Sequence, residues 1–213
     1  MTKNIKKMTK IQKNLFLLIL FCLVLYSIRI YITKSLFFGF LVWNLFLAVI
    51  PYFISLIVKK KFQNSSKLKL IVILFIWLLF LPNAPYIITD FIHLHHIKST
   101  LIWLDIFLLF TFSFTGLLLA IISITDIYKI IQQKWNTKSA NYFSLSATFL
   151  CGFGIYLGRF LRFNSWDVFT TPITVLKKSL LSINDPKTWY ITIAFGSFLY
   201  LLLLLSKNFT TAK

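Results

Sequence analysis

The chain has 213 residues, of which 58% are apolar and 24 are Phe, and its mean hydropathy is +0.81. These values exclude a water-soluble globular domain. The formal net charge of +18 does not indicate nucleic-acid binding, because apolar stretches separate the basic residues and no basic stripe with interleaved aromatic residues is present. Composition therefore predicts a membrane protein that is surrounded by the lipid bilayer and has no nucleic-acid partner.

Six apolar segments have about the length needed to cross a hydrocarbon core as a helix, which takes roughly 20 residues. They cover residues 15–32, 36–58, 70–88, 101–124, 141–157 and 189–205. The remaining loops are too short for a separate soluble domain. The sequence thus predicts an all-α, polytopic transmembrane helical bundle of about six spans, which forms a single integral membrane domain over residues 1–213. Cys22 and Cys151 lie within spans and are expected to be small buried residues without a disulfide.

The basic residues predict the orientation of these spans. Fifteen of the 23 Lys and Arg residues fall on the side that also holds both termini. The positive-inside rule makes that side cytoplasmic, in the cell membrane. The inner connectors at residues 59–69 and 126–140 are expected to be solvated loops, whereas residues 33–35, 93–100 and 159–188 lie on the outer face. The first span is expected to remain uncleaved, because no small-x-small site follows it.

The third span is interrupted by Pro82-Asn83-Ala84-Pro85. Proline removes a backbone donor and clashes with the preceding turn, so two prolines in four residues predict a broken helix. Broken backbone within a membrane persists where it is buried in protein or lines a wet cavity. The freed carbonyls and Asn83 are therefore candidate ligand contacts. The alternative is a simple kink that is capped by Asn83 and Tyr86.

Polar residues gather in the outer halves of the predicted spans. Tyr86, Asp90 and His93 share a face at helical spacing after the break. Because polar groups in a bilayer usually face the bundle interior, a single outward-opening pocket is expected. Other spans contribute polar residues to the same region, namely Arg29, Asn44 and Asp105.

The segment GRFLRFNSWD, residues 158–167, carries two of the three Arg residues in a chain that has 20 Lys. Arg binds phosphate or carboxylate in a bidentate manner, so Arg159 and Arg162, at i and i+3, would together clamp an anion. Asn164 and Asp167 would help to orient it. The alternative is a structural network in which Asp90, Asp105 and Asp167 neutralise Arg29, Arg159 and Arg162.

Residues 172–183 are expected to form an interfacial helix before the last span, because Ile173, Leu176, Leu180 and Ile183 form an apolar stripe opposite Lys177 and Lys178.

Asp90 and His93, together with His95 and His96, also permit a metal hypothesis. We reject it because histidines at a water interface need no metal, and His95 and His96 are adjacent and point in different directions. No cofactor motif is present.

Three ordered blocks carry a family resemblance. They are WNLFLA at residues 43–48 with Pro51-Tyr52, LPNAPYIITD at residues 81–90 with His93-Leu94, and GRFLRFNSWD. These blocks resemble those of a bacterial integral-membrane family, domain of unknown function 1361, over roughly residues 36–175. The resemblance implies a small multi-span membrane protein and no particular activity.

The function predicted from the sequence is that of a multi-pass membrane protein whose outer pocket binds an anionic or lipid-linked group. The binding residues would be Arg159, Arg162, Asn83, Tyr86, Asn44, Asn164 and Asp167. One alternative is an envelope-lipid-modifying enzyme with Asp90 or His93 as acid and base. Another is a scaffold in which the Arg and Asp residues are purely structural. A transporter is not favoured, because the inner halves of the spans hold few polar groups and no internal repeat is visible.

Overall fold

The fold is known from a computed structural model that describes residues 8–62, 66–96 and 101–211, and most of these residues are helical and none is in a strand. The first half contains α1 (Lys10–Thr33), α2 (Gly39–Ile57), the π-helical η1 (Val58–Phe62), α3 (Lys67–Phe80), α4 (Asn83–Tyr86) and the 3-10 helix η2 (Ile87–His96). The second half contains α5 (Ile102–Lys134), α6 (Thr137–Phe160), α7 (Asp167–Thr170), α8 (Pro172–Ser182) and α9 (Pro186–Thr211).

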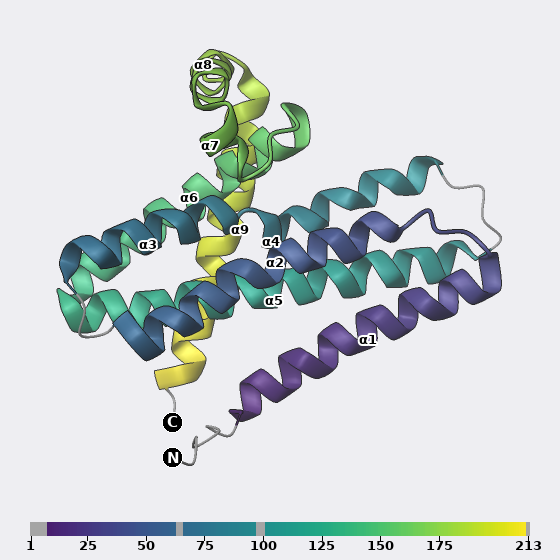
Figure 1. Cartoon of the computed structure of the whole chain (residues 1–213), viewed down its shortest axis with the longest axis horizontal. Helices are drawn as coiled ribbons and strands as arrows, with labels where there is room; N and C mark the ends of the chain where they lie inside the picture. The colour runs from purple at the N-terminus through teal and green to yellow at the C-terminus, as the bar shows by residue number, and fades with distance from the viewer. Residues whose placement is uncertain (1–7, 63–65, 97–100, 212–213) are drawn as a thin grey trace.

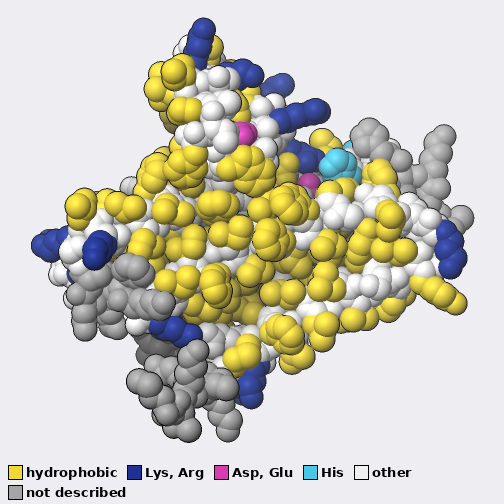
Figure 2. All heavy atoms as spheres, viewed as in Figure 1, with side chains coloured by type: hydrophobic (Ala, Val, Ile, Leu, Met, Phe, Trp, Pro, Cys, Tyr) yellow, Lys and Arg dark blue, Asp and Glu magenta, His cyan; other side chains and the backbone are white. Residues whose placement is uncertain are grey.

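Six helical stretches in the described part of the chain are long and apolar enough to cross a membrane. Each corresponds to one predicted span, so the prediction of an all-α polytopic bundle is confirmed. Large apolar side chains remain exposed along all six, and Figure 2 shows them covering much of the visible surface. An apolar surface of this extent requires lipid around it. The protein is therefore a multi-pass membrane protein.

The segment 126–140 differs from the predicted loop, because α5 continues to Lys134 and α6 already begins at Thr137. Asp126 is buried, with 8% exposure, and its carboxylate accepts a hydrogen bond from Lys59 Nζ at 2.7 Å. This ion pair ties the end of α5 to η1. The prediction failed because polar composition was taken to indicate a loop, although a paired charge is compatible with a continuing helix.

The helices of the bundle do not all run parallel to one another (Figure 1). The central helix α5 packs against α1, α2, α4 and α6, and α9 packs along α6. Figure 1 shows that α5 and α9 run in clearly different directions, and that α7 and α8 project beyond the bundle at the end where α6 passes into α7. The start of α1 and the end of α9 lie at the opposite end.

The predicted break in the third span is confirmed. α3 ends at Phe80, and the chain continues as α4 and then as a 3-10 helix. Glycines on neighbouring helices make room for the broken segment. A Cβ atom on Gly116 of α5 would collide with the Ala84 carbonyl oxygen, and one on Gly154 of α6 would collide with the Pro82 ring. The break is thus packed closely against protein, as an interrupted helix in a membrane requires.

Candidate functional site

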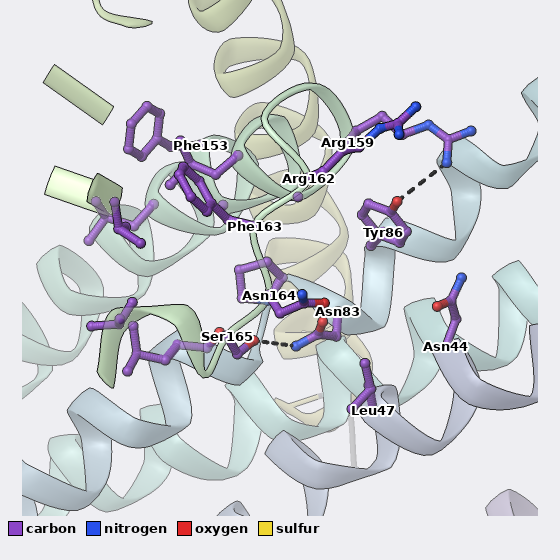
Figure 3. Close-up of a pocket in the computed structure, with 18 of the residues that line it drawn as sticks. Asn44, Leu47, Asn83, Tyr86, Phe153, Arg159, Arg162, Phe163, Asn164 and Ser165 are labelled. Carbon is purple, nitrogen blue, oxygen red and sulfur yellow. Dashed lines mark hydrogen bonds between the residues drawn. The ribbon is translucent and has the colours of Figure 1, made fainter. Parts of the chain in front are cut away.

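A cavity of about 750 Å³ lies between α2, the broken third span, the end of α6 and the segment that leads to α8. One part of its wall is polar and the other apolar (Figure 3). The polar part comprises Asn44, Asn83, Tyr86, His93, Arg159, Arg162, Asn164 and Ser165. The apolar part includes Leu47, Leu78, Leu79, Leu150, Phe153, Leu157, Phe163, Val168 and Val175. A cavity of this size and composition suits an amphipathic molecule.

The guanidinium of Arg159, beside the cavity, forms several hydrogen bonds with the broken third span. Its Nη1 donates to Asp90 Oδ1 at 3.2 Å and to the Tyr86 hydroxyl at 3.3 Å, and its Nη2 donates to the Thr89 carbonyl at 3.0 Å. Nη2 also lies 3.5 Å from His93 Nε2. The predicted grouping of Tyr86, Asp90 and His93 therefore occurs, although it is built on a 3-10 helix in which Asp90 and His93 are one turn apart.

Asp90 lies behind the cavity wall and is only 1% exposed. Besides Arg159, its carboxylate accepts a hydrogen bond from Asn44 Nδ2 at 2.7 Å. A buried carboxylate held by a guanidinium and an amide is well compensated. Arg159 and Asp90 consequently form a neutral pair.

Arg162 differs from Arg159 in both backbone and environment. α6 ends at Phe160, and Arg162 follows with φ of 56°, in the left-handed region. The helical spacing expected for the two arginines is therefore absent, yet both side chains line the same cavity and extend toward its Tyr86 end (Figure 3). Arg162 is exposed, and among the described residues it forms no hydrogen bond or ion pair.

The segment after Arg162 is anchored to the broken span by Ser165. Its hydroxyl donates to the Leu79 carbonyl at 2.9 Å and accepts from Asn83 Nδ2 at 2.8 Å, and the same amide nitrogen donates to the Phe80 carbonyl at 2.9 Å. Carbonyls near the break, which were predicted to be candidate ligand contacts, are thus bonded within the chain. The amide oxygen of Asn83 has no hydrogen-bond partner among the described residues.

Asp167 does not line the cavity. Its carboxylate accepts a hydrogen bond from the backbone N–H of Asn164 at 2.7 Å and so closes the turn before α7. The side chain of Asn164 lines the cavity and forms no hydrogen bond with the described residues. Of these two predicted binding residues, only Asn164 faces the space where a ligand would lie.

Arg29 and Asp105 form a second ion pair, away from the cavity. Arg29 Nε lies 3.1 Å from Asp105 Oδ1, both side chains are buried, and Arg29 Nη1 donates to the Ser35 carbonyl at 2.8 Å. This pair joins α1 to α5. The predicted pairing of three arginines with three aspartates is therefore seen for two arginines in the described residues, and Arg162 stands apart.

The histidines form no metal-binding group within the described part of the chain, where no three His, Cys, Asp or Glu side chains come together. His93 contacts Arg159 and packs against Phe40, with ring centroids 4.7 Å apart. His95 is exposed, and the side chain of His96 lies outside the described residues.

Several cavity residues were not predicted from the sequence. Ser165 stands within the quoted GRFLRFNSWD block, but nothing in the spacing indicated that it would reach Leu79. The apolar residues Leu150, Phe153 and Val175 resemble ordinary lipid-facing or core residues in sequence, and only their position around the cavity distinguishes them. The apolar half of the site therefore had no detectable sequence signal.

Comparison with known proteins gives a family and nothing more specific. The chain matches no curated protein and no solved structure. A family model does match residues 43–202, which include all three signature blocks and every cavity residue. Because this match spans most of the chain, the protein belongs to the family described as "Protein of unknown function (DUF1361)".

Proposed function

We propose that this protein binds the anionic head group of a lipid in the cavity between α2, α4 and α6, with the cavity open to the outer face of the cell membrane. Arg162 carries the proposal. It lines the cavity, it is exposed, and it lacks an acidic partner among the described residues, whereas Arg29 and Arg159 are each paired with a buried Asp. An unpaired guanidinium beside neutral amides favours an anion.

The apolar half of the cavity supports a lipid as the ligand. Leu150 lines the cavity and is also 50% exposed on the surface of α6, within a predicted span. This exposure supports an opening of the cavity toward the lipid. An acyl chain would pass from the bilayer along Leu150 and Phe153, while its head group would lie near Arg162.

The projecting helix α8 supports the same assignment. Its exposed apolar residues Ile173, Leu176 and Leu180 suit the boundary between head groups and acyl chains. Lys177 and Lys178 would reach lipid phosphates from the other side of this helix. Val175 of α8 also lines the cavity, so a helix lying on the outer leaflet would form part of the site.

The orientation rests on the basic residues at the two ends of the bundle. Most of the described lysines belong to the predicted inner segments, namely the start of α1, η1, the start of α3, the junction of α5 and α6, and the end of α9. This bias supports cytoplasmic termini and an outward-opening cavity.

Lipid binding is better supported than the two alternatives. As an acid or base for lipid modification, Asp90 would need access to the ligand, but it is buried and engaged by Arg159 and Asn44. A purely structural role fits Arg29 and Arg159, because both are paired. It does not account for Arg162, which faces the cavity without an acidic partner in the described residues.

The test is mass spectrometry of the lipids that co-purify with wild type, Arg162→Gln and Lys138→Gln. Both variants remove one positive charge from an exposed residue, but Lys138 lies at the start of α6 and does not line the cavity. We expect Arg162→Gln to lose most of its bound anionic lipid and Lys138→Gln to retain it. Equal occupancy in all three proteins would refute the proposal.

A further inference from the structure

Taking the proposed lipid binding as its basis, we infer that the ligand is a phosphodiester lipid with a single negative charge, whose head group carries hydroxyls. The charge balance of the cavity is the first argument. Arg159 is neutralised by Asp90, so among the described lining residues Arg162 is the remaining guanidinium without an acidic partner. One unpaired positive charge matches one phosphodiester charge. A phosphate monoester carries about −1.5 to −2 at neutral pH and would be incompletely compensated.

The neutral polar groups are the second argument. Hydrogen bonds to Asp90 and Ser165 engage the amide nitrogens of Asn44 and Asn83, and their amide oxygens have no partner among the described residues. In Figure 3 these two amides project from different helices, α2 and α4. Amide oxygens accept hydrogen bonds and repel a bare anion. The ligand must therefore supply donors in addition to its phosphate.

Hydroxyls meet this requirement better than an ammonium group does. No Asp or Glu is present among the described residues that line the cavity, so a cationic head group would lie near two guanidiniums without a carboxylate to bind it. Hydroxyls both donate and accept. They would donate to Asn44 and Asn83 and would accept from the free side-chain amide of Asn164.

The experiment compares lipids with identical acyl chains. Phosphatidylglycerol, phosphatidylethanol and phosphatidic acid are titrated onto detergent-solubilised protein, and the dissociation constants are measured by native mass spectrometry. Phosphatidylethanol has the same phosphodiester charge as phosphatidylglycerol but no hydroxyl. We expect phosphatidylglycerol to bind about tenfold more tightly than phosphatidylethanol, as one or two additional hydrogen bonds would give. Phosphatidic acid should also bind more weakly than phosphatidylglycerol.

Two variants separate the head-group contacts from the charge. Asn164→Ala should weaken phosphatidylglycerol binding about threefold to tenfold and leave phosphatidylethanol unchanged, since it removes one amide. Arg162→Gln should weaken both lipids by similar factors. Glycerophosphoglycerol, the deacylated head group, serves as the water-soluble arm. It should bind far more weakly than the lipid, and equal affinity would exclude a lipid as the source of the ligand.

Failure of this inference is distinct from failure of the proposed function. If phosphatidylglycerol and phosphatidylethanol bind equally and Arg162→Gln weakens both, hydroxyl recognition is wrong and anionic-lipid binding stands. If Arg162→Gln weakens neither lipid, the proposed function itself is wrong. A threefold or greater loss of both lipids in Asn164→Ala would also contradict hydroxyl recognition, because that amide would then serve the phosphate or the fold.

Discussion

Arg159 and Asp90 lie 69 positions apart in the chain, and their side chains meet at 3.2 Å beside the cavity. The pair joins the end of α6 to η2, the 3-10 helix that follows the break in the third span. Both members belong to blocks that were singled out from the sequence, GRFLRFNSWD and LPNAPYIITD. The two blocks therefore meet in the folded protein, and Asp90, behind the cavity wall, balances the charge of Arg159 in that wall.

The ion pair should be essential for stability. Asp90→Asn or Arg159→Gln alone leaves a buried charge without its partner, a loss of about 3–5 kcal/mol in the free energy of unfolding. The double variant removes both charges and should be less destabilised than the sum of the two single variants. Thermal unfolding in detergent measures all three. Single variants that melt like wild type would show that the pair contributes nothing.

Gly116 should not tolerate even one added methyl group. The Cβ atom of Gly116→Ala would collide with the backbone oxygen of Ala84, which cannot move away as the end of a side chain can. Overpacking of this kind costs about 1–3 kcal/mol. In Gly39→Ala the nearest atom is the Tyr26 hydroxyl at 3.2 Å, so this variant is the matched control and should melt near wild type. Equal melting temperatures for both variants would contradict the close contact at the break.

Ser165→Ala should loosen the segment that carries Arg162. The substitution removes the hydrogen bonds to Leu79 and Asn83, at a cost of about 1–3 kcal/mol for the groups left unpaired. Lipid occupancy should fall together with thermal stability, because Asn164 and Arg162 would lose their fixed positions. Ser197→Ala in α9 removes only hydrogen bonds to the Ile193 and Ala194 carbonyls of its own helix and should change neither quantity. Full lipid occupancy in Ser165→Ala would show that this anchor does not shape the site.

The orientation of the protein in the membrane is tested by introducing one cysteine at a time. Cys22 and Cys151 are both free and fully buried, so they should give little background with a membrane-impermeant maleimide. Lys187→Cys, at the start of α9, should be labelled in intact cells. Lys138→Cys, near the start of α6, should be labelled only after the membrane is opened. The reverse pattern would invert the proposed topology.

The sequence predicted the helices and the polar half of the cavity for identifiable physical reasons. Span length and hydropathy are properties of local sequence, and Pro82 and Pro85 interrupt a helix wherever they occur. Residues such as Asn44, Tyr86 and Arg159 were found because polar groups in apolar spans are costly. Their cost makes them informative without any knowledge of tertiary structure.

The remaining features depend on the tertiary structure. The pairing of Asp90 with Arg159, rather than with Arg162, follows from the end of α6 at Phe160 and the left-handed turn after it. The apolar wall around Phe153 exists only because α6 and the segment before α8 enclose a space. The extension of α5 to Lys134 carries the buried Asp126, whose partner Lys59 is distant in sequence. None of these relationships is encoded in a local pattern.

The most direct test of the central claim is an electron cryo-microscopy map of the protein purified in native lipid. The account predicts elongated density in the cavity, with its head group in contact with Arg162 and its chain passing along Phe153 and Leu150 to the bilayer. The same density should be absent from a map of Arg162→Gln prepared identically. A cavity that holds only water in both maps, with Arg162 turned onto Asp167, would contradict the account.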